Sequence, residues 1–138
     1  MKAVRPDPET SARMARIRQK GTKIETIVAT VLRDLGARYR KNVKKLPGSP
    51  DFANRSRRWA VFVNGCFWHH HKGCRRATIP KSNRKFWIAK FRDNRRRDAR
   101  SIARLRREGY RVVLIWECQE GLIRDKLAKV LEPRRVDA

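Results

Sequence analysis

The densest group of chemically active side chains in this sequence is the segment Cys66–Cys74, which holds two thiols and three adjacent imidazoles. A third cysteine, Cys118, follows the end of a separate predicted strand. Zn2+ prefers four tetrahedral ligands drawn from thiolate and imidazole groups. Three thiolates and one imidazole would therefore complete a closed zinc site. We expect His71 to supply the imidazole, because it lies close to Cys74 and leaves His69 beside the acidic residues, although spacing alone does not select one histidine of the three.

A zinc ion held by four protein ligands has no position open to substrate, so its role would be structural. It would join the loop to the end of the last strand and offset a small core. The alternative is that the cysteines are reduced and buried while the histidines form a surface run. An odd number of cysteines, in a chain with no apolar N-terminal segment, argues against a disulfide framework.

Asp51 is the candidate catalytic carboxylate, because it stands between Pro50 and Phe52 at the start of a predicted strand. A carboxylate in that place can present its oxygens at a sheet edge and bind a hard cation such as Mg2+. In nuclease chemistry such a cation stabilises charge on the phosphate while a general base activates water. Glu25 and His69 are the other candidate parts. Taken singly, Asp51 is compatible with an ordinary turn aspartate and Glu25 with a helix-capping residue.

The charge balance indicates a polyanionic partner. The chain has 37 Lys and Arg against 13 Asp and Glu, a formal net charge of +24, and the basic residues are spread from Lys2 to Arg135. Such a field destabilises a compact fold unless a polyanion neutralises it. Nucleic acid is the expected partner, because counterion release drives its binding; a ribosomal-type protein, a membrane-surface protein and a solubility adaptation are the alternatives. With no membrane-length apolar run and no signal peptide, we expect a soluble intracellular protein.

The length of 138 residues suits one domain with one modest core. We expect a flexible arm at 1–10, a single domain at 11–132 and a tail at 133–138. Thr22 and Glu25 fit a capping box, and apolar residues then recur at helical spacing as far as Gly36. Further elements are predicted at 11–20 (helix), 38–46 (edge strand), 51–53 and 59–64 (strands), 65–81 (loop), 83–108 (helix), 110–116 (strand) and 120–131 (helix). This order predicts an α/β fold with a mixed sheet flanked by helices on both faces.

Several motifs in this order resemble the very-short-patch repair (Vsr) endonucleases. The resemblance covers about residues 10 to 120 without large gaps, and its Gly-Cys-Phe-Trp-His core at 65–69 is highly specific. The matching segments are the opening stretch 11–25, Pro50-Asp51-Phe52, the run 61–71, Phe86-Trp87, Asn94 with Arg97-Asp98, and Trp116-Glu117-Cys118.

The resemblance implies a restriction-endonuclease-like fold and a Mg2+-dependent nick on the 5′ side of the thymine in a T:G mismatch, the lesion left when 5-methylcytosine deaminates. It implies that Asp51 binds Mg2+ with the backbone carbonyl of Val63 and that His69 is the general base. It also implies that Glu25 is a carboxylate that contacts these groups without binding Mg2+ itself. The structural zinc would be held by Cys66, His71, Cys74 and Cys118.

Three features depart from related patterns. Restriction-type nucleases usually carry an acid-x-Lys motif on the strand after the first aspartate, and residues 61–65 lack it, as Vsr proteins do. Asn64 stands where some Vsr relatives have a histidine suited to the phosphate or a bound water. Asparagine can hydrogen-bond there but cannot carry a proton charge. Gly73 also adds one residue between His71 and Cys74 relative to some members.

Phe67 and Trp68 are candidates for wedging between base pairs, because unstacking costs least at a mispair. A consecutive pair on a strand cannot point into one core, whereas Phe86 and Phe91 are expected to be core residues. The resemblance adds Trp87 as a third wedge, which on sequence alone is equally compatible with a core position. It also adds Met14 and Ile17 as minor-groove contacts, and Lys90 and Asn94 near the mispair, four residues apart on one helix face.

Three functions remain open at this point. The first is Vsr-type nicking of double-stranded DNA at T:G mismatches. The second is restriction-type or other-lesion cleavage by a nuclease of the same superfamily, and the third is zinc-stabilised nucleic-acid binding without catalysis. The family resemblance further implies a bacterial, cytoplasmic, nucleoid-associated protein that acts with mismatch-repair proteins. Because a single-strand nick needs one active site, we expect a monomer.

Overall fold

The computed structural model describes residues 22–132, and the predicted arm at 1–10, the helix at 11–20 with Met14 and Ile17, and the tail at 133–138 lie outside them. Four strands of the described chain form one sheet in the order β1-β2-β3-β4. They are β1 (Arg40–Lys41), β2 (Phe52–Asn54), β3 (Trp59–Asn64) and β4 (Arg111–Trp116). β2 is antiparallel to both β1 and β3, while β3 and β4 are parallel. The sheet is therefore mixed, as predicted.

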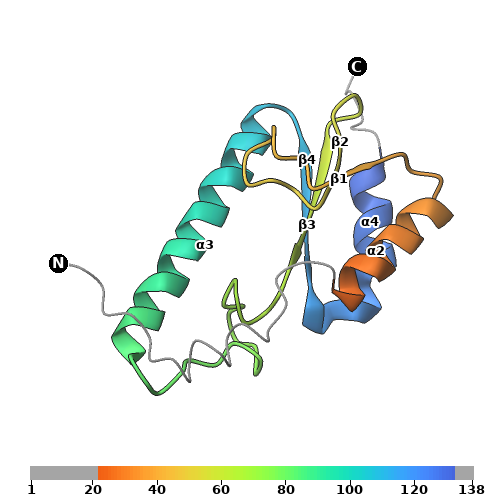
Figure 1. Ribbon diagram of the computed structural model, residues 1–138. Coiled ribbons are helices and arrows are strands. Elements are labelled where there is room, and N and C mark those ends of the chain that lie inside the picture. The colour runs from red at the N-terminus through yellow and green to blue at the C-terminus, as the bar shows by residue number, and fades with distance from the viewer. Residues whose placement is uncertain (1–21, 133–138) are drawn as a thin grey trace.

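Helices cover both faces of this sheet (Figure 1). Helix α3 (Arg84–Arg107) lies on one face, and α2 (Lys23–Asp34) and α4 (Ile123–Leu131) lie on the other. Thr22 is the N-cap of α2 and its hydroxyl accepts a hydrogen bond from the backbone N–H of Glu25, as the capping-box pattern predicted. The predicted α/β architecture with helices on both faces is confirmed.

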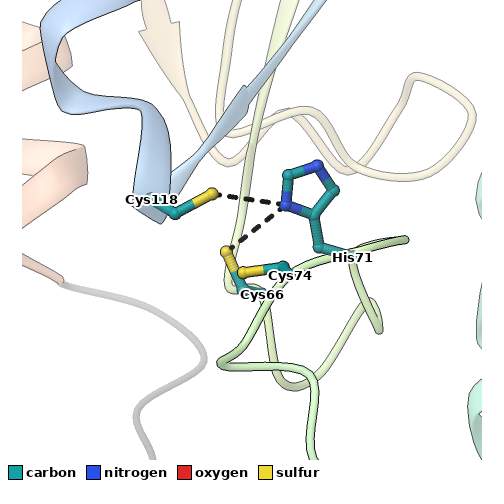
Figure 2. Close-up of side chains that lie close together, drawn as sticks. All are labelled: Cys66, His71, Cys74 and Cys118. Atoms are coloured by element: carbon teal, nitrogen blue, oxygen red, sulfur yellow. Dashed lines mark hydrogen bonds between the residues drawn. The ribbon is translucent and has the colours of Figure 1, made fainter.

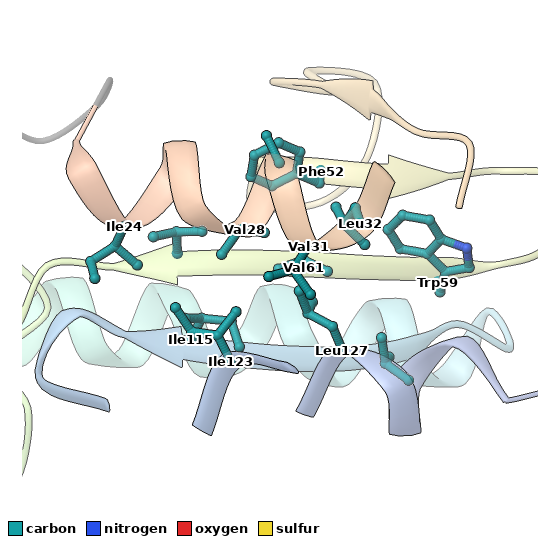
Figure 3. Packing of buried hydrophobic residues seen from close by; sticks show 13 residues of the cluster. Ile24, Val28, Val31, Leu32, Phe52, Trp59, Val61, Ile115, Ile123 and Leu127 are labelled. Atoms are coloured by element: carbon teal, nitrogen blue, oxygen red, sulfur yellow. The ribbon is translucent and has the colours of Figure 1, made fainter. Parts of the chain in front are cut away.

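The core has one layer on each side of the sheet because β3 is buried along its whole length. Val61 faces the layer formed with α2 and α4, where Val28, Leu32 and Leu127 are fully buried (Figure 3). The neighbouring Phe62 faces the layer under α3, because successive strand side chains point to opposite faces. Truncating a fully buried leucine such as Leu32 to alanine would cost about 2–5 kcal/mol.

Two predicted boundaries are wrong. The strand expected at 38–46 pairs only over Arg40–Lys41, because Asn42 adopts a left-handed φ of 50° that ends the extended ladder. The last helix begins at Ile123 rather than at 120, because Glu117–Leu122 forms a 3-10 segment interrupted at Gln119. Within the described part of the chain, no helix combines the length and apolar character needed to cross a membrane.

Candidate functional site

Four side chains from two separate segments gather at the end of the sheet where β3 and β4 finish. Cys66, His71 and Cys74 come from the loop after β3, and Cys118 comes from the 3-10 segment after β4 (Figure 2). One ligand atom from each lies within 4.8 Å of all the others. His71 Nδ1 is 3.3 Å from Cys118 Sγ and 3.7 Å from Cys66 Sγ. Tertiary folding therefore brings together the four residues expected at the zinc site.

The loop is held in this shape by its own backbone and by the residues that follow β4. The N–H of His71 donates to the carbonyl of Cys66 at 2.9 Å. Glu117 accepts a hydrogen bond from the N–H of Cys66 at 3.1 Å, and the His71 ring stacks on Trp116 with ring centroids 4.0 Å apart. These contacts hold the two segments together before any ion is considered.

The donor set and its spacing fit a structural zinc ion. Zinc–sulfur and zinc–nitrogen bonds of about 2.3 and 2.05 Å at a tetrahedral angle place the two ligand atoms about 3.6 Å apart, close to the spacings around His71. Burial raises the pKa of the Cys66 thiol to about 12. A bound cation stabilises the thiolate, so metal binding would release the proton of such a thiol to solvent.

Asp51 lies at the same end of the sheet, immediately before β2. It is 9% exposed, and its Oδ2 accepts a hydrogen bond from the N–H of Val63 at 2.7 Å. The N–H and C=O of one strand residue project to the same side, so the Val63 carbonyl faces the Asp51 side of β3. Carboxylate and backbone carbonyl oxygens are the ligands that hard cations prefer. Asp51 and the Val63 carbonyl therefore fit a hard cation such as Mg2+.

His69 and Asp98 form a close pair between the loop and α3. His69 Nδ1 is 2.6 Å from Asp98 Oδ2, and both side chains are about one-third exposed. With neutral imidazole, the carboxylate fixes the proton on Nδ1 and leaves Nε2 as an acceptor. The His69 N–H donates to the carbonyl of Gly65, two residues beyond Val63. The pair can accept a proton at the end of the sheet that carries Asp51.

Asp98 received no role from sequence reasoning. The signal that could have found it is its spacing, since Asp98 follows Asn94 by four residues and therefore shares that helix face. Of the other predicted polar residues, Asn64 is buried at the last position of β3, and Glu25 is partly buried in the first turn of α2. A carboxylate there also interacts favourably with the helix dipole.

The three predicted wedge residues form one aromatic cluster with Phe91 of α3. Phe67 is 5% and Trp87 4% exposed, whereas Trp68 is only partly buried. The rings of Phe67 and Trp68 meet edge to face at 5.1 Å. Both can join one cluster because 66–70 is a series of turns, so the strand argument for separating them does not apply. The indole N–H of Trp87 is buried and has no hydrogen-bond partner among the described residues.

Helix α3 fixes the position of this loop. Asn94 donates from its amide to the carbonyl of Trp68 at 3.2 Å, while Lys90, one turn earlier, is exposed. His70, which has a left-handed φ of 47°, stacks on Phe91 with centroids 4.6 Å apart. Its Nδ1 lies 3.2 Å from the guanidinium of Arg95, and burial together with that positive charge lowers the pKa of His70. His70 is therefore directed toward α3, away from the cluster of cysteines.

Comparisons with known proteins identify a matching family and several relatives. The family model described as DNA mismatch endonuclease Vsr matches residues 5–76. A type II nicking enzyme of Xanthomonas oryzae is 42% identical over 87% of this chain and 90% of its own length. The DNA mismatch endonuclease Vsr of Escherichia coli is 38% identical over 88% of this chain and 80% of its own. A type II nicking enzyme of Neisseria meningitidis is 37% identical over 86% of each chain.

Proposed function

Since this chain belongs to the Vsr family of DNA mismatch endonucleases, we propose that it nicks double-stranded DNA on the 5′ side of the thymine in a T:G mismatch. The mismatch would be the one that deamination of 5-methylcytosine produces. The observation that carries the proposal is the presence of two pairs, the Asp51–Val63 contact before β2 and the His69–Asp98 contact between the loop after β3 and α3, together with an aromatic cluster of the same loop and helix.

Asp51 and the Val63 carbonyl would hold Mg2+, which when bound stabilises the charge that develops on the scissile phosphate. The hydrogen bond from the Val63 N–H keeps the Asp51 carboxylate turned toward β3. The burial of Asp51 limits the orientations that its side chain can adopt. Asn64, the next residue, would donate its amide hydrogens to a phosphate oxygen or a nearby water, without the proton exchange that a histidine provides.

His69 would take a proton at Nε2 from the attacking water. Asp98 holds the imidazole in the required tautomer and stabilises the imidazolium that forms, so the pair acts as an oriented general base. Glu25, at the start of α2, would act indirectly through the groups around Asp51.

Mismatch selectivity would come from the aromatic cluster. Trp68 is its most exposed wedge residue, and Phe67 and Trp87 lie behind it. Moving Trp87 toward DNA breaks no hydrogen bond made by its indole N–H within the described structure. Because unstacking is least costly at a mispair, insertion would select T:G over paired bases. Lys90 and Asn94 lie on the helix face beside the cluster and would contact the mispair. Met14 and Ile17 would contact the minor groove.

A zinc ion on Cys66, His71, Cys74 and Cys118 would keep this loop rigid. The ion would have no part in the reaction because its four protein ligands close the coordination sphere. A monomer that carries one such site suffices for a single-strand nick, and mismatch-repair proteins would be its partners.

Nicking assays on three matched duplexes test the proposal. Duplexes containing T:G, T:A or C:G at one position are incubated with the enzyme and Mg2+, and each strand carries its own label. We expect a nick only in the thymine strand of the T:G duplex. Equal cutting of all three would indicate a nuclease with another target, and binding without cutting would indicate a non-catalytic role.

A further inference from the structure

A groove of about 590 Å³ runs along the β1 edge of the sheet, outside the residues assigned to catalysis, zinc and the mispair. We call it the β1 groove. Among the described residues, four cations and no acidic side chain line it; the four are Arg38, Arg40, Lys41 and Arg55. β1 is the terminal strand in the sheet order β1-β2-β3-β4, so the groove lies at a margin of the sheet.

The β1 groove begins beside the catalytic end of the sheet and leads away from it. Lys41 pairs with Phe52, the residue after Asp51, and Arg40 pairs with Ala53. The N–H of Asn42 donates to the carbonyl of Asp51 itself at 3.0 Å. Arg38 and Arg55 lie further from that end of the sheet, and Arg55 is four residues after Asp51 in the chain. At about 3.3 Å per extended residue, the groove reaches about 13 Å from Asp51.

The four cations are exposed, and none of the ion pairs formed within residues 22–132 includes them. The groove walls are nevertheless held together. Asn54 donates from its amide to the carbonyl of Arg38 at 3.0 Å and accepts from the N–H of Arg57 at 2.9 Å. Like charges held in a fixed groove repel one another unless an anion neutralises them. The arrangement is therefore preorganised for a polyanion.

We propose that the β1 groove binds the phosphate backbone of the DNA duplex flanking the nick, beyond the base pairs around the mismatch. The inference rests on the proposed function, because the scissile phosphate at Asp51 sets the path of the DNA. Three of the four cations are arginines, whose planar guanidinium groups suit phosphate oxygens. The groove's one aromatic ring, Tyr39, packs edge-on against Phe52 with centroids 5.2 Å apart, so the groove favours a backbone over stacked single-stranded bases.

The spacing of phosphates along DNA sets how long the flanking duplex must be to fill the β1 groove. One strand of a duplex carries a phosphate about every 3.4 Å along the axis, so about 13 Å corresponds to roughly four nucleotides. A duplex whose flank is shorter than this would reach the active site without filling the groove. Longer flanks would bind more tightly and with a steeper dependence on salt.

Binding by the variant Arg38→Gln/Arg40→Gln/Arg55→Gln tests the inference. Affinity is measured by fluorescence anisotropy over a salt series, on T:G duplexes with flanks of roughly three or roughly fifteen base pairs. For the long flank we expect an affinity loss of about tenfold or more. The slope of log K against log salt concentration should become shallower by about 2.7, because each of the three lost phosphate contacts contributes about 0.9. Short-flank affinity should fall much less, because of the three arginines only Arg40 lies within reach of that flank. Single-turnover nicking of that duplex at saturating enzyme should stay at the wild-type value.

Matched variants separate charge from structure. Arg38→Lys/Arg40→Lys/Arg55→Lys keeps the charges and should retain most of the salt slope. Arg55→Gln is compared with Lys129→Gln, which removes one exposed charge from α4, and only the first should weaken long-flank binding. Melting temperature and zinc content confirm that each variant is folded.

The inference would be overturned if the triple glutamine variant kept the wild-type salt slope on the long-flank duplex. It would also be overturned if that variant lost affinity equally for both duplexes. Failure of the proposed function has a different signature, since the wild type would then show no preference for T:G while fully paired duplexes still report the flank effect.

Discussion

The carboxylate of Asp98 lies 2.6 Å from Nδ1 of His69 and links the middle of α3 to the loop after β3. The two residues are 29 positions apart in the chain. Their contact gives the imidazole a fixed orientation and a defined tautomer whenever it is neutral. It also connects the loop that carries the metal ligands to the helix that carries Lys90 and Asn94. Activity should therefore depend on a residue that need not touch DNA.

Replacing Asp98 by Asn should lower the single-turnover nicking rate by about 10- to 100-fold, because His69 loses the charge that stabilises its protonated form. DNA affinity and zinc content should not change. Asp93→Asn, an exposed change on the same helix, is the matched control and should be neutral. The assay follows nicking of a T:G duplex across a pH series. Wild-type rates for Asp98→Asn at every pH would contradict the assigned role.

The variant Asp51→Asn should lose cleavage by at least about a thousandfold while remaining folded. The amide oxygen of asparagine can still accept the Val63 N–H, so the local structure is preserved, but the negative charge that attracts Mg2+ is lost. Binding to a T:G duplex should be retained. Single-turnover nicking with titrated Mg2+ measures the effect, and substantial residual cleavage at ordinary Mg2+ would reject Asp51 as the metal-binding carboxylate.

The variant Cys118→Ser should lose its zinc and unfold at a lower temperature, by on the order of 10 °C, because metal binding and folding share one free energy. Elemental analysis of the purified protein and thermal denaturation are the measurements. His70→Gln is a useful control, since His70 is adjacent to His71 but contacts Phe91 and Arg95 instead. It should keep one zinc per chain. A zinc-free wild-type protein with the same melting temperature would argue against a structural metal.

The variant Trp68→Ala should reduce the preference for T:G over T:A by about tenfold, as expected for an aromatic–base stacking energy of about 1–3 kcal/mol. A fluorescent base analogue beside the mismatch reports unstacking. As a control, Ile88→Ala removes an exposed apolar side chain of α3 that lies outside the aromatic cluster, and it should leave the preference intact. If Trp68→Ala and the wild type prefer T:G over T:A equally, Trp68 has no part in mismatch recognition.

The sequence predicted several elements because their signals are local. Thr22 and Glu25 specify the start of α2, and the continuous apolar run of β3 specifies a strand buried on both faces. The three thiols of the Cys/His cluster were also predictable, because the segment Cys66–Cys74 concentrates donor groups and Cys118 is the remaining cysteine. These inferences require only residue type and spacing, whereas spacing alone did not select His71 from the three histidines.

Contacts between distant segments were decided by the tertiary structure alone. The β4 end brings Cys118 to His71, and α3 brings Asp98 to His69, yet neither pairing is encoded by a local period. The turns at 66–70 place Phe67 and Trp68 in one cluster, which strand alternation would forbid. The left-handed φ of Asn42 ends β1 after two residues, and the pairing of β1 with β2 brings Arg38 and Arg40 beside Arg55 in one groove. The sequence by itself thus determined which chemical groups are present, whereas the packing of helices against the sheet determined which of them meet.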